Sequence, residues 1–189
     1  MNILKNKILL EVKIEGNGIL KVDTFLNHQV DIPLINKIAK KFYNYYKNNK
    51  ITKILTIEAS GIAIAAFVAK NFKVPLIFAK KSFGKNINNK YYTSIVKSYT
   101  KNITYTIYVS KNFILKNDKV LLIDDFLANG SALLGLSNIV KSSGANIVGA
   151  GIVIEKTFLP GFKYVKKEGI NVYSLIKIAS IKNNNIIFK

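Results

Sequence analysis

Short apolar runs alternate along the chain with stretches in which apolar residues recur every three or four positions. The runs have the length of buried strands, and the spaced stretches have the period of helices. This pattern predicts strands over residues 53–57, 75–79, 120–123 and 147–154, and helices over 2–12, 31–48, 62–71 and 131–142. It also predicts a hairpin of strands 92–99 and 103–109 that turns at Lys101 and Asn102. The tail over 160–189 is expected to form a short helix and small strands, with a turn near Asn183 and Asn184. Residues 16–31 follow neither period and are expected to be irregular.

Two of the helices have an apolar face that predicts which side chains they bury. The first carries Ile3, Leu4 and Ile8 at helical spacing. The second is expected to begin at Asp31, just before Pro33, because an aspartate ahead of a proline is a common helix start. Its apolar face is formed by Ile35, Ile38, Phe42 and Tyr45.

Apolar strands joined by helices predict an α/β fold with a mainly parallel twisted sheet that helices flank on both faces. In such sheets ligands bind beyond the carboxyl ends of the strands. The segments at these ends are 58–61, 80–81, 124–132 and 155–156, and candidate chemistry is sought there. The chain shows no internal repeat and no linker, so one domain is expected.

Composition excludes several classes of protein. Hydrophobic residues make up 49% of the 189 residues and charged residues 21%, which excludes a disordered polyelectrolyte. The chain has no cysteine and one histidine, which excludes disulfides, thiolate metal sites and a histidine metal cluster. No run of about 18 apolar residues is present and the N-terminus does not resemble a secretory signal, so we expect a cytoplasmic protein with no membrane contact.

The formal net charge of +19 invites a nucleic-acid interpretation. All of the basic residues are lysines, however, and they are scattered rather than clustered. Abundant lysine, asparagine and isoleucine are what an AT-rich coding sequence favours, and arginine would be the better residue for bidentate phosphate contacts. We therefore do not expect nucleic acid as the main partner, and a substrate with several phosphates fits the charge with fewer residues.

The first chemical motif is the pair Asp124 and Asp125, followed by a loop of small residues and then a helix. Adjacent carboxylates at a strand end repel each other and are retained where sugar hydroxyls or Mg²⁺ compensate. The helix N-terminus behind the loop can bind an anion. The pattern predicts a site for a phosphorylated sugar. The alternative is an ordinary turn in which Asp125 or Asn129 caps the helix.

A second loop of this kind, Glu58–Gly61, opens onto the helix expected to follow strand 53–57. Alone it is a weak signal, since any crossover turn has this form. It gains weight because it would lie on the same sheet edge as the first loop. Two anion sites beside a pair of carboxylates fit a ribose that carries a phosphate at one end and a pyrophosphate at the other.

The segment 120–132 resembles the phosphoribosyl pyrophosphate signature of the type I phosphoribosyltransferases. Three segments, 20–29, 123–130 and 149–161, are similar to the branch of that family that acts on xanthine. The first and third are not shared by phosphoribosyltransferases in general. The resemblance implies the type I phosphoribosyltransferase fold and an enzyme that converts xanthine and phosphoribosyl pyrophosphate to xanthosine 5′-monophosphate and pyrophosphate, with Mg²⁺.

The resemblance also implies roles for individual residues around the sugar donor. Asp124 and Asp125 would face the ribose hydroxyls or their Mg²⁺. The 5′-phosphate would be held by Ala128, Asn129, Gly130, Ser131 and Ala132. The pyrophosphate would be held by Glu58, Ala59, Ser60 and Gly61, in a loop that often contains a cis peptide bond. Lys80 and Lys81 would neutralise the leaving group, although the family usually has arginine at the first of these positions, and residues 82–103 would close over the site.

For the base, the resemblance implies Leu20, Asn27 and Lys156. Lysine donates only, so Lys156 suits a 6-oxo group and rejects the 6-amino group of adenine. The backbone N–H of Leu20 would face the 2-oxo group of xanthine. Asn27 both donates and accepts but cannot act as a general base, and none is assigned. The neighbouring His28 is expected to be a surface residue.

At the level of the whole chain, the resemblance implies a homodimer of single domains. In each, residues 1–32 and 160–189 would form a small hood over a core of residues 33–159. A guanine or hypoxanthine phosphoribosyltransferase is the nearer alternative. A DNA-binding regulator that senses phosphoribosyl pyrophosphate is the more distant one, because the first core strand begins near residue 53 and leaves no room for a DNA-binding domain.

Overall fold

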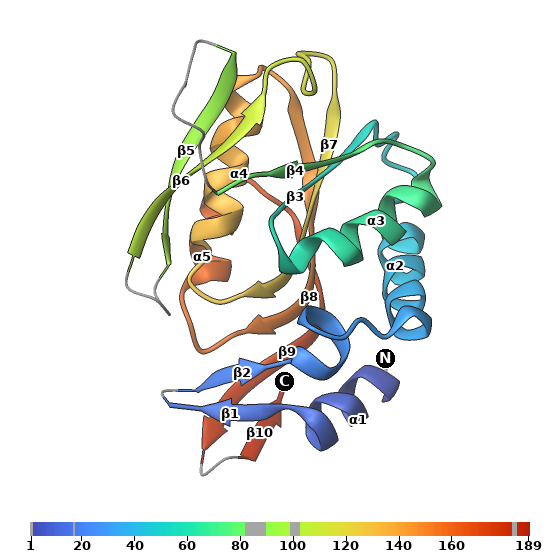
Figure 1. Ribbon diagram of the computed structural model, residues 1–189, viewed down its shortest axis with the longest axis vertical. Coiled ribbons are helices and arrows are strands. Elements are labelled where there is room, and N and C mark those ends of the chain that lie inside the picture. The colour runs from blue at the N-terminus through green and yellow to red at the C-terminus, as the bar shows by residue number, and fades with distance from the viewer. Residues whose placement is uncertain (1, 17, 82–89, 99–102, 183–184) are drawn as a thin grey trace.

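A six-stranded sheet forms the centre of the molecule in the computed structural model, which describes residues 2–16, 18–81, 90–98, 103–182 and 185–189 (Figure 1). The strand order is β10-β9-β8-β7-β3-β4, and every pair is parallel except β10 with β9. The bounds are β3 Lys53–Ile57, β4 Leu76–Ala79, β7 Lys119–Leu127, β8 Asn146–Lys156, β9 Val172–Lys182 and β10 Asn185–Phe188. The mainly parallel α/β fold is therefore confirmed.

Helices cover both faces of this sheet, as a parallel sheet requires. On one face lie α2 (Ile32–Tyr46) and α3 (Ser60–Phe72), which pack on Leu121 and Ile123. On the other face lie α4 (Ser131–Ser142) and α5 (Gly161–Lys167), in the same core as Val120 and Leu122. Successive side chains of β7 point to opposite faces, so its continuous apolar run serves both cores.

The predicted hairpin is present as β5 (Tyr91–Ser98) and β6 (Ile103–Ser110), and it packs beside α4 (Figure 1). Lys80, just beyond β4, joins β6 through two backbone hydrogen bonds with Tyr108, both 3.1 Å. The hairpin is therefore anchored to the central sheet at the end of β4. The turn at 101–102, residues 82–89 of the expected closing loop and the turn at 183–184 lie outside the described residues.

The first thirty residues contain more regular structure than predicted. Helix α1 (Asn2–Glu11) is followed by β1 (Lys13–Glu15) and β2 (Ile19–Lys21), which pair as an antiparallel hairpin, and then by a π-helix, η1 (Asp23–Asn27). The expectation that residues 16–31 are irregular was wrong. Each of these strands has only three residues, which is too short for an alternation of apolar and polar residues to be recognised.

Two expected core positions are also corrected. Leu4 and Ile8 are fully buried, but Ile3 is 49% exposed. In the last turn of α2 the buried tyrosine is Tyr46 rather than Tyr45, which is 47% exposed. The hydroxyl of Tyr46 donates to the carbonyl of Ala150 at 3.0 Å, so a polar contact with β8 selects this tyrosine for the core.

The strands of the central sheet are longer than the apolar pattern indicated. β7 was expected to end at residue 123 and continues to Leu127, so Asp124 and Asp125 lie within the strand rather than after it. β8 likewise ends at Lys156, and β9 has 11 residues where small strands were expected. β7 accommodates two acids because β3 pairs with it only as far as Leu55 and Leu122, which leaves its last part open on that side.

Within the described parts of the chain, none of the helices combines the length and apolar content that a membrane span requires.

Candidate active site

Two adjacent carboxyl groups lie at the carboxyl end of the central strand β7. Asp124 is 4% exposed and Asp125 is 7% exposed. The backbone N–H of Asp125 donates to Oδ1 of Asp124 at 3.0 Å, and that of Phe126 donates to Oδ1 of Asp125 at 2.9 Å. One oxygen of each carboxyl group is thus held by the backbone, which fixes the orientation of both side chains.

Burial raises the pKa of Asp124 well above its usual value, and the neighbouring charge of Asp125 adds to the effect. The charge of Lys81 acts in the opposite direction. A cation or several hydroxyl donors placed beside this pair would restore the ionised form. The pair is therefore suited to a ligand that brings positive charge or hydroxyl groups to it.

Oxygen donors of this kind are also those that Mg²⁺ prefers. Among the described residues, however, no group of three or more histidine, cysteine, aspartate or glutamate side chains could hold a metal ion. The two carboxyl groups fit Mg²⁺ only where further oxygen ligands come from a substrate or from water.

Directly after β7, residues Ala128–Ala132 curve around a cavity of 190 Å³. Gly130 has φ of +82° and serves as the N-cap of α4. No side chain caps this helix, so neither Asp125 nor Asn129 has the capping role considered above. The backbone N–H groups of the first turn of α4 therefore have no side-chain acceptor and can receive an anion.

Gly161, at the start of α5, supports this loop and was not singled out from the sequence. Its N–H donates to the carbonyl of Ala128 at 3.0 Å. A β-carbon at position 161 would lie 2.3 Å from that carbonyl oxygen and 2.6 Å from the nitrogen of Gly130. Only glycine lets the two segments approach so closely. The sequence could not reveal this requirement, because it depends on a contact between segments that are distant along the chain.

The second predicted loop lies between β3 and α3, on the same sheet edge. The peptide bond between Glu58 and Ala59 is cis, as the resemblance implied. Ser60 and Gly61 begin α3, which also has no side-chain cap. A β-carbon on Gly61 would lie 3.5 Å from Oδ1 of Asp124, so this loop and the acid pair are neighbours.

Thr56 is a further residue that the sequence did not reveal. Its hydroxyl is fully buried and finds no hydrogen-bond partner among the residues that the structure describes. It lies 2.1 Å from the position that a β-carbon on Gly61 would take. The glycine is therefore required where α3 begins, because any side chain there would collide with Thr56.

The two predicted lysines differ in their surroundings. The backbone N–H of Lys81 donates to Oε1 of Glu58, and its ammonium group lies 5.3 Å from the ring centre of Tyr105. Both lysines are exposed, and the backbone of Lys80 makes the bridge to β6. Lys81 is thus the lysine that the structure connects with both the second loop and the acid pair.

Lys156 is the last residue of β8, on the same edge as the acids. Its ammonium group donates to the carbonyl of Gly18 at 2.8 Å and lies 5.8 Å from the ring centre of Phe126. Burial lowers its pKa. The lysine therefore connects the central sheet with the β1–β2 hairpin.

The other two residues expected to contact the base lie on the N-terminal elements. Leu20 is in β2, opposite Ile14 of β1, and its side chain is 6% exposed. Asn27 ends η1 and is exposed, as is His28 beside it. η1 packs against α3, the helix that the second loop opens onto.

Comparison with known proteins gives the family. The sequence profile described as "Phosphoribosyl transferase domain" matches residues 21–184. The chain is 50% identical over 188 residues to the xanthine phosphoribosyltransferase of Ruminiclostridium cellulolyticum, covering 100% of this chain and 99% of that one. It is 52% identical over 190 residues to the xanthine phosphoribosyltransferase of Clostridium tetani, covering 100% of both chains.

Solved structures agree at the level of the fold. Adenine phosphoribosyltransferase from Thermoanaerobacter pseudethanolicus superposes with a TM-score of 0.77 at 22% identity, over 92% of this chain and 99% of that one. The enzyme from Giardia lamblia, in complex with 9-deazaadenine, gives 0.79 at 22% identity, over 94% and 98%. With a matching domain profile, full-length relatives at about 50% identity and this fold, the chain belongs to the xanthine phosphoribosyltransferase family, a family of transferases within the type I phosphoribosyltransferases.

Proposed function

We propose that this protein transfers the 5-phosphoribosyl group of phosphoribosyl pyrophosphate to xanthine and forms xanthosine 5′-monophosphate and pyrophosphate. One observation carries the proposal. Two helices without side-chain caps, α3 and α4, begin on either side of a buried carboxyl pair at one sheet edge. This arrangement matches a donor with a phosphate, a diol and a pyrophosphate.

In the reaction, a ring nitrogen of xanthine forms a bond to C1′ of the ribose. The bond from C1′ to the pyrophosphate oxygen breaks, pyrophosphate leaves with the electron pair, and the proton of the base nitrogen passes to solvent. The transition state carries positive charge on the ribose. Asp124 and Asp125 bind the ribose hydroxyls and stabilise that charge.

Mg²⁺ bound with the donor would neutralise charge on the departing pyrophosphate. Asp124 and Asp125 are the residues of this chain that would contact it, together with oxygens of the donor. Lys80 and Lys81 add positive charge beside the second loop. Ala128, Asn129, Gly130, Ser131 and Ala132 hold the 5′-phosphate, and Glu58, Ala59, Ser60 and Gly61 hold the pyrophosphate.

The base is bound between the sheet edge and the N-terminal hairpin. Lys156 donates to the 6-oxo group and keeps its contact with Gly18, since an ammonium group has three protons to donate. The backbone N–H of Leu20 donates to the 2-oxo group, which guanine lacks, and Asn27 completes the contacts. Residues 1–32 and 160–189 then act as a hood over the core of residues 33–159, in a cytoplasmic homodimer.

The experiment is an activity panel. The protein is mixed with Mg²⁺, phosphoribosyl pyrophosphate and each of xanthine, guanine, hypoxanthine and adenine, and the nucleotide products are separated. Xanthosine monophosphate is expected as the dominant product. A preference for guanine or hypoxanthine would support the transfer reaction but contradict the role given to Leu20. If no base gives a product, the proposal that the protein is a phosphoribosyltransferase is wrong.

A further inference from the structure

The segment from Phe25 to Asp31 is closed on itself by backbone hydrogen bonds. The N–H of Asp31 donates to the carbonyl of Phe25 at 3.1 Å, so its two ends meet. Two of its N–H groups, those of His28 and Gln29, also donate to the carbonyl of Asp23, just before the segment, at 3.2 and 2.8 Å. Asn27 lies on this segment, which we call the 25–31 loop, and its position depends on how the loop is held.

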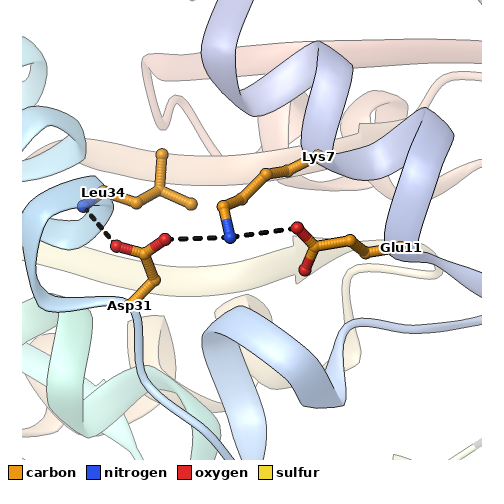
Figure 2. Close-up of polar contacts among 4 residues, drawn as sticks. All are labelled: Lys7, Glu11, Asp31 and Leu34. Atoms are coloured by element: carbon orange, nitrogen blue, oxygen red, sulfur yellow. Dashed lines mark hydrogen bonds and ion pairs between the residues drawn. The ribbon is translucent and has the colours of Figure 1, made fainter.

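Lys7 of α1 contacts both ends of the 25–31 loop. Its ammonium group lies 2.9 Å from Oδ2 of Asp31 and 5.8 Å from the ring centre of Phe25, which is fully buried. Asp31 is itself fixed, because its Oδ1 accepts the N–H of Leu34 at 2.9 Å and so begins α2 (Figure 2). One lysine thus joins α1, the 25–31 loop and the start of α2.

The other contact of Lys7 is with Glu11, at 3.1 Å to Oε1, so the ammonium group lies between two carboxylates as Figure 2 shows. The side chains of Lys7 and Asp31 are 27% and 23% exposed, which is less than in the lysine–glutamate pairs of Lys21 and Lys141. Hydrogen bonding from Lys7 and then from Thr24 lowers the pKa of Glu11. In a chain with 29 lysines and 10 acidic residues, Lys7 uses two of the ten acids, which sets it apart from the scattered lysines of the surface.

We infer that Lys7 is a positioning residue for base binding. By holding the two ends of the 25–31 loop, it fixes the place of Asn27 relative to α3 and to the sheet edge. It does not touch the groups assigned to the sugar donor. The inference rests on the proposed function for its kinetic consequence, but the ordering of the loop by Lys7 can be measured without activity.

The test uses Lys7→Met in the full-length protein, which keeps the apolar stem and removes the charge. We expect KM for xanthine to rise about fivefold, as for the loss of a partly exposed ion-pair network, while kcat and KM for phosphoribosyl pyrophosphate stay within about twofold. Lys7→Arg should restore most of the affinity. In parallel, hydrogen exchange at the amides of His28, Gln29 and Asp31 should become faster in Lys7→Met and return toward the wild-type rate in Lys7→Arg.

Lys5→Met is the matched control, because Lys5 lies on the same helix and makes no ion pair among the described residues, its ammonium group lying 5.2 Å from the ring centre of Phe188. Equal KM values and exchange rates in the Lys7 and Lys5 variants would overturn the inference. A fall in kcat with a rise in both KM values would overturn it too, because that result indicates general destabilisation. If the wild type forms no xanthosine monophosphate, the proposed function fails, and unchanged exchange in Lys7→Met would then overturn the positioning role separately.

Discussion

At the scale of single residues, the acid pair of β7 has opposite effects on stability and on activity. Burial of Asp124 beside Asp125 disfavours the charged carboxyl group in the free protein. A donor that brings hydroxyl groups and a cation to the same place compensates for this cost. The charged carboxyl pair therefore destabilises the ligand-free protein most, and a bound cation or sugar hydroxyls would relieve this cost.

Asp124→Asn should therefore lower turnover and raise stability. We expect kcat at saturating substrates to fall about 10- to 100-fold, because a group that stabilises the transition state is lost. The melting temperature of the ligand-free protein should rise by several degrees, since about 1 kcal/mol corresponds to about 2–4 °C in a chain of this size. Steady-state kinetics and thermal unfolding measure the two effects. Full activity in the variant would remove Asp124 from the mechanism.

The effect on stability should also depend on pH in a defined direction. The pKa of Asp124 is raised in the folded state, so above about pH 4 the folded protein binds more protons than the unfolded chain, and stability falls as pH rises. The gain in melting temperature from Asp124→Asn should therefore grow as the pH rises above about 4 in the absence of Mg²⁺. Asp118→Asn is the control, because Asp118 accepts hydrogen bonds from Thr52 and Leu115 at the other end of β7. That variant should be less stable and should keep its turnover.

At the scale of elements, the two anion loops depend on glycines that let other segments approach. Gly61 leaves room for the side chain of Thr56, and Gly161 leaves room for the backbone of the loop before α4. The helices behind these loops supply N–H groups that no side chain caps. The groups proposed to bind the donor are therefore largely backbone atoms, and close packing sets their positions.

Gly161→Ala should damage the 5′-phosphate loop without touching the acids. The added β-carbon would lie 2.3 Å from the carbonyl oxygen of Ala128, so the loop must move. We expect KM for phosphoribosyl pyrophosphate to rise about tenfold to a hundredfold, as small displacements of binding groups do. Gly169→Ala is the control, because a β-carbon there meets nothing within 4 Å, although its φ of +76° adds backbone strain that Gly161 does not have. An equal rise in KM in both variants would show that general strain around α5, rather than the contact with Ala128, raises KM.

At the scale of the whole molecule, the site connects two parts of the fold. The sheet edge supplies the acids and the two loops, while α1, the β1–β2 hairpin and η1 lie across that edge (Figure 1). Lys156 reaches from β8 to the carbonyl of Gly18 and links them. Binding of the donor and of the base should therefore stabilise the molecule as a unit.

Phosphoribosyl pyrophosphate with Mg²⁺ should accordingly raise the melting temperature. At about 100 times its dissociation constant, a ligand adds about 2.7 kcal/mol, or about 5–10 °C here. Chelation of the metal should remove most of this shift, because the two carboxyl groups would then face the donor without a cation. A shift of the same size with and without Mg²⁺ would show that the lysines and the helix N-termini bind the donor by themselves. Differential scanning calorimetry with and without a chelator measures it.

The sequence by itself determined the type of fold and the position of the motifs that we assign to the donor. Apolar runs and helical periods are local properties, so β3, α4 and the β5–β6 hairpin could be predicted within a residue or two. The acids at 124 and 125 and the loops at 58–61 and 128–132 were visible because each is continuous in sequence. The comparison with known proteins then agreed with the family that these segments resemble.

Only the tertiary structure decided which residues support those motifs. Tyr46 rather than Tyr45 continues the buried face of Ile38 and Phe42, and the carbonyl of Ala150 accepts a hydrogen bond from its hydroxyl. Gly161 contacts the loop assigned to the 5′-phosphate, and Lys7 contacts the 25–31 loop, from segments that are distant in sequence. Such contacts depend on three-dimensional distance and burial, which no pattern along a single chain records.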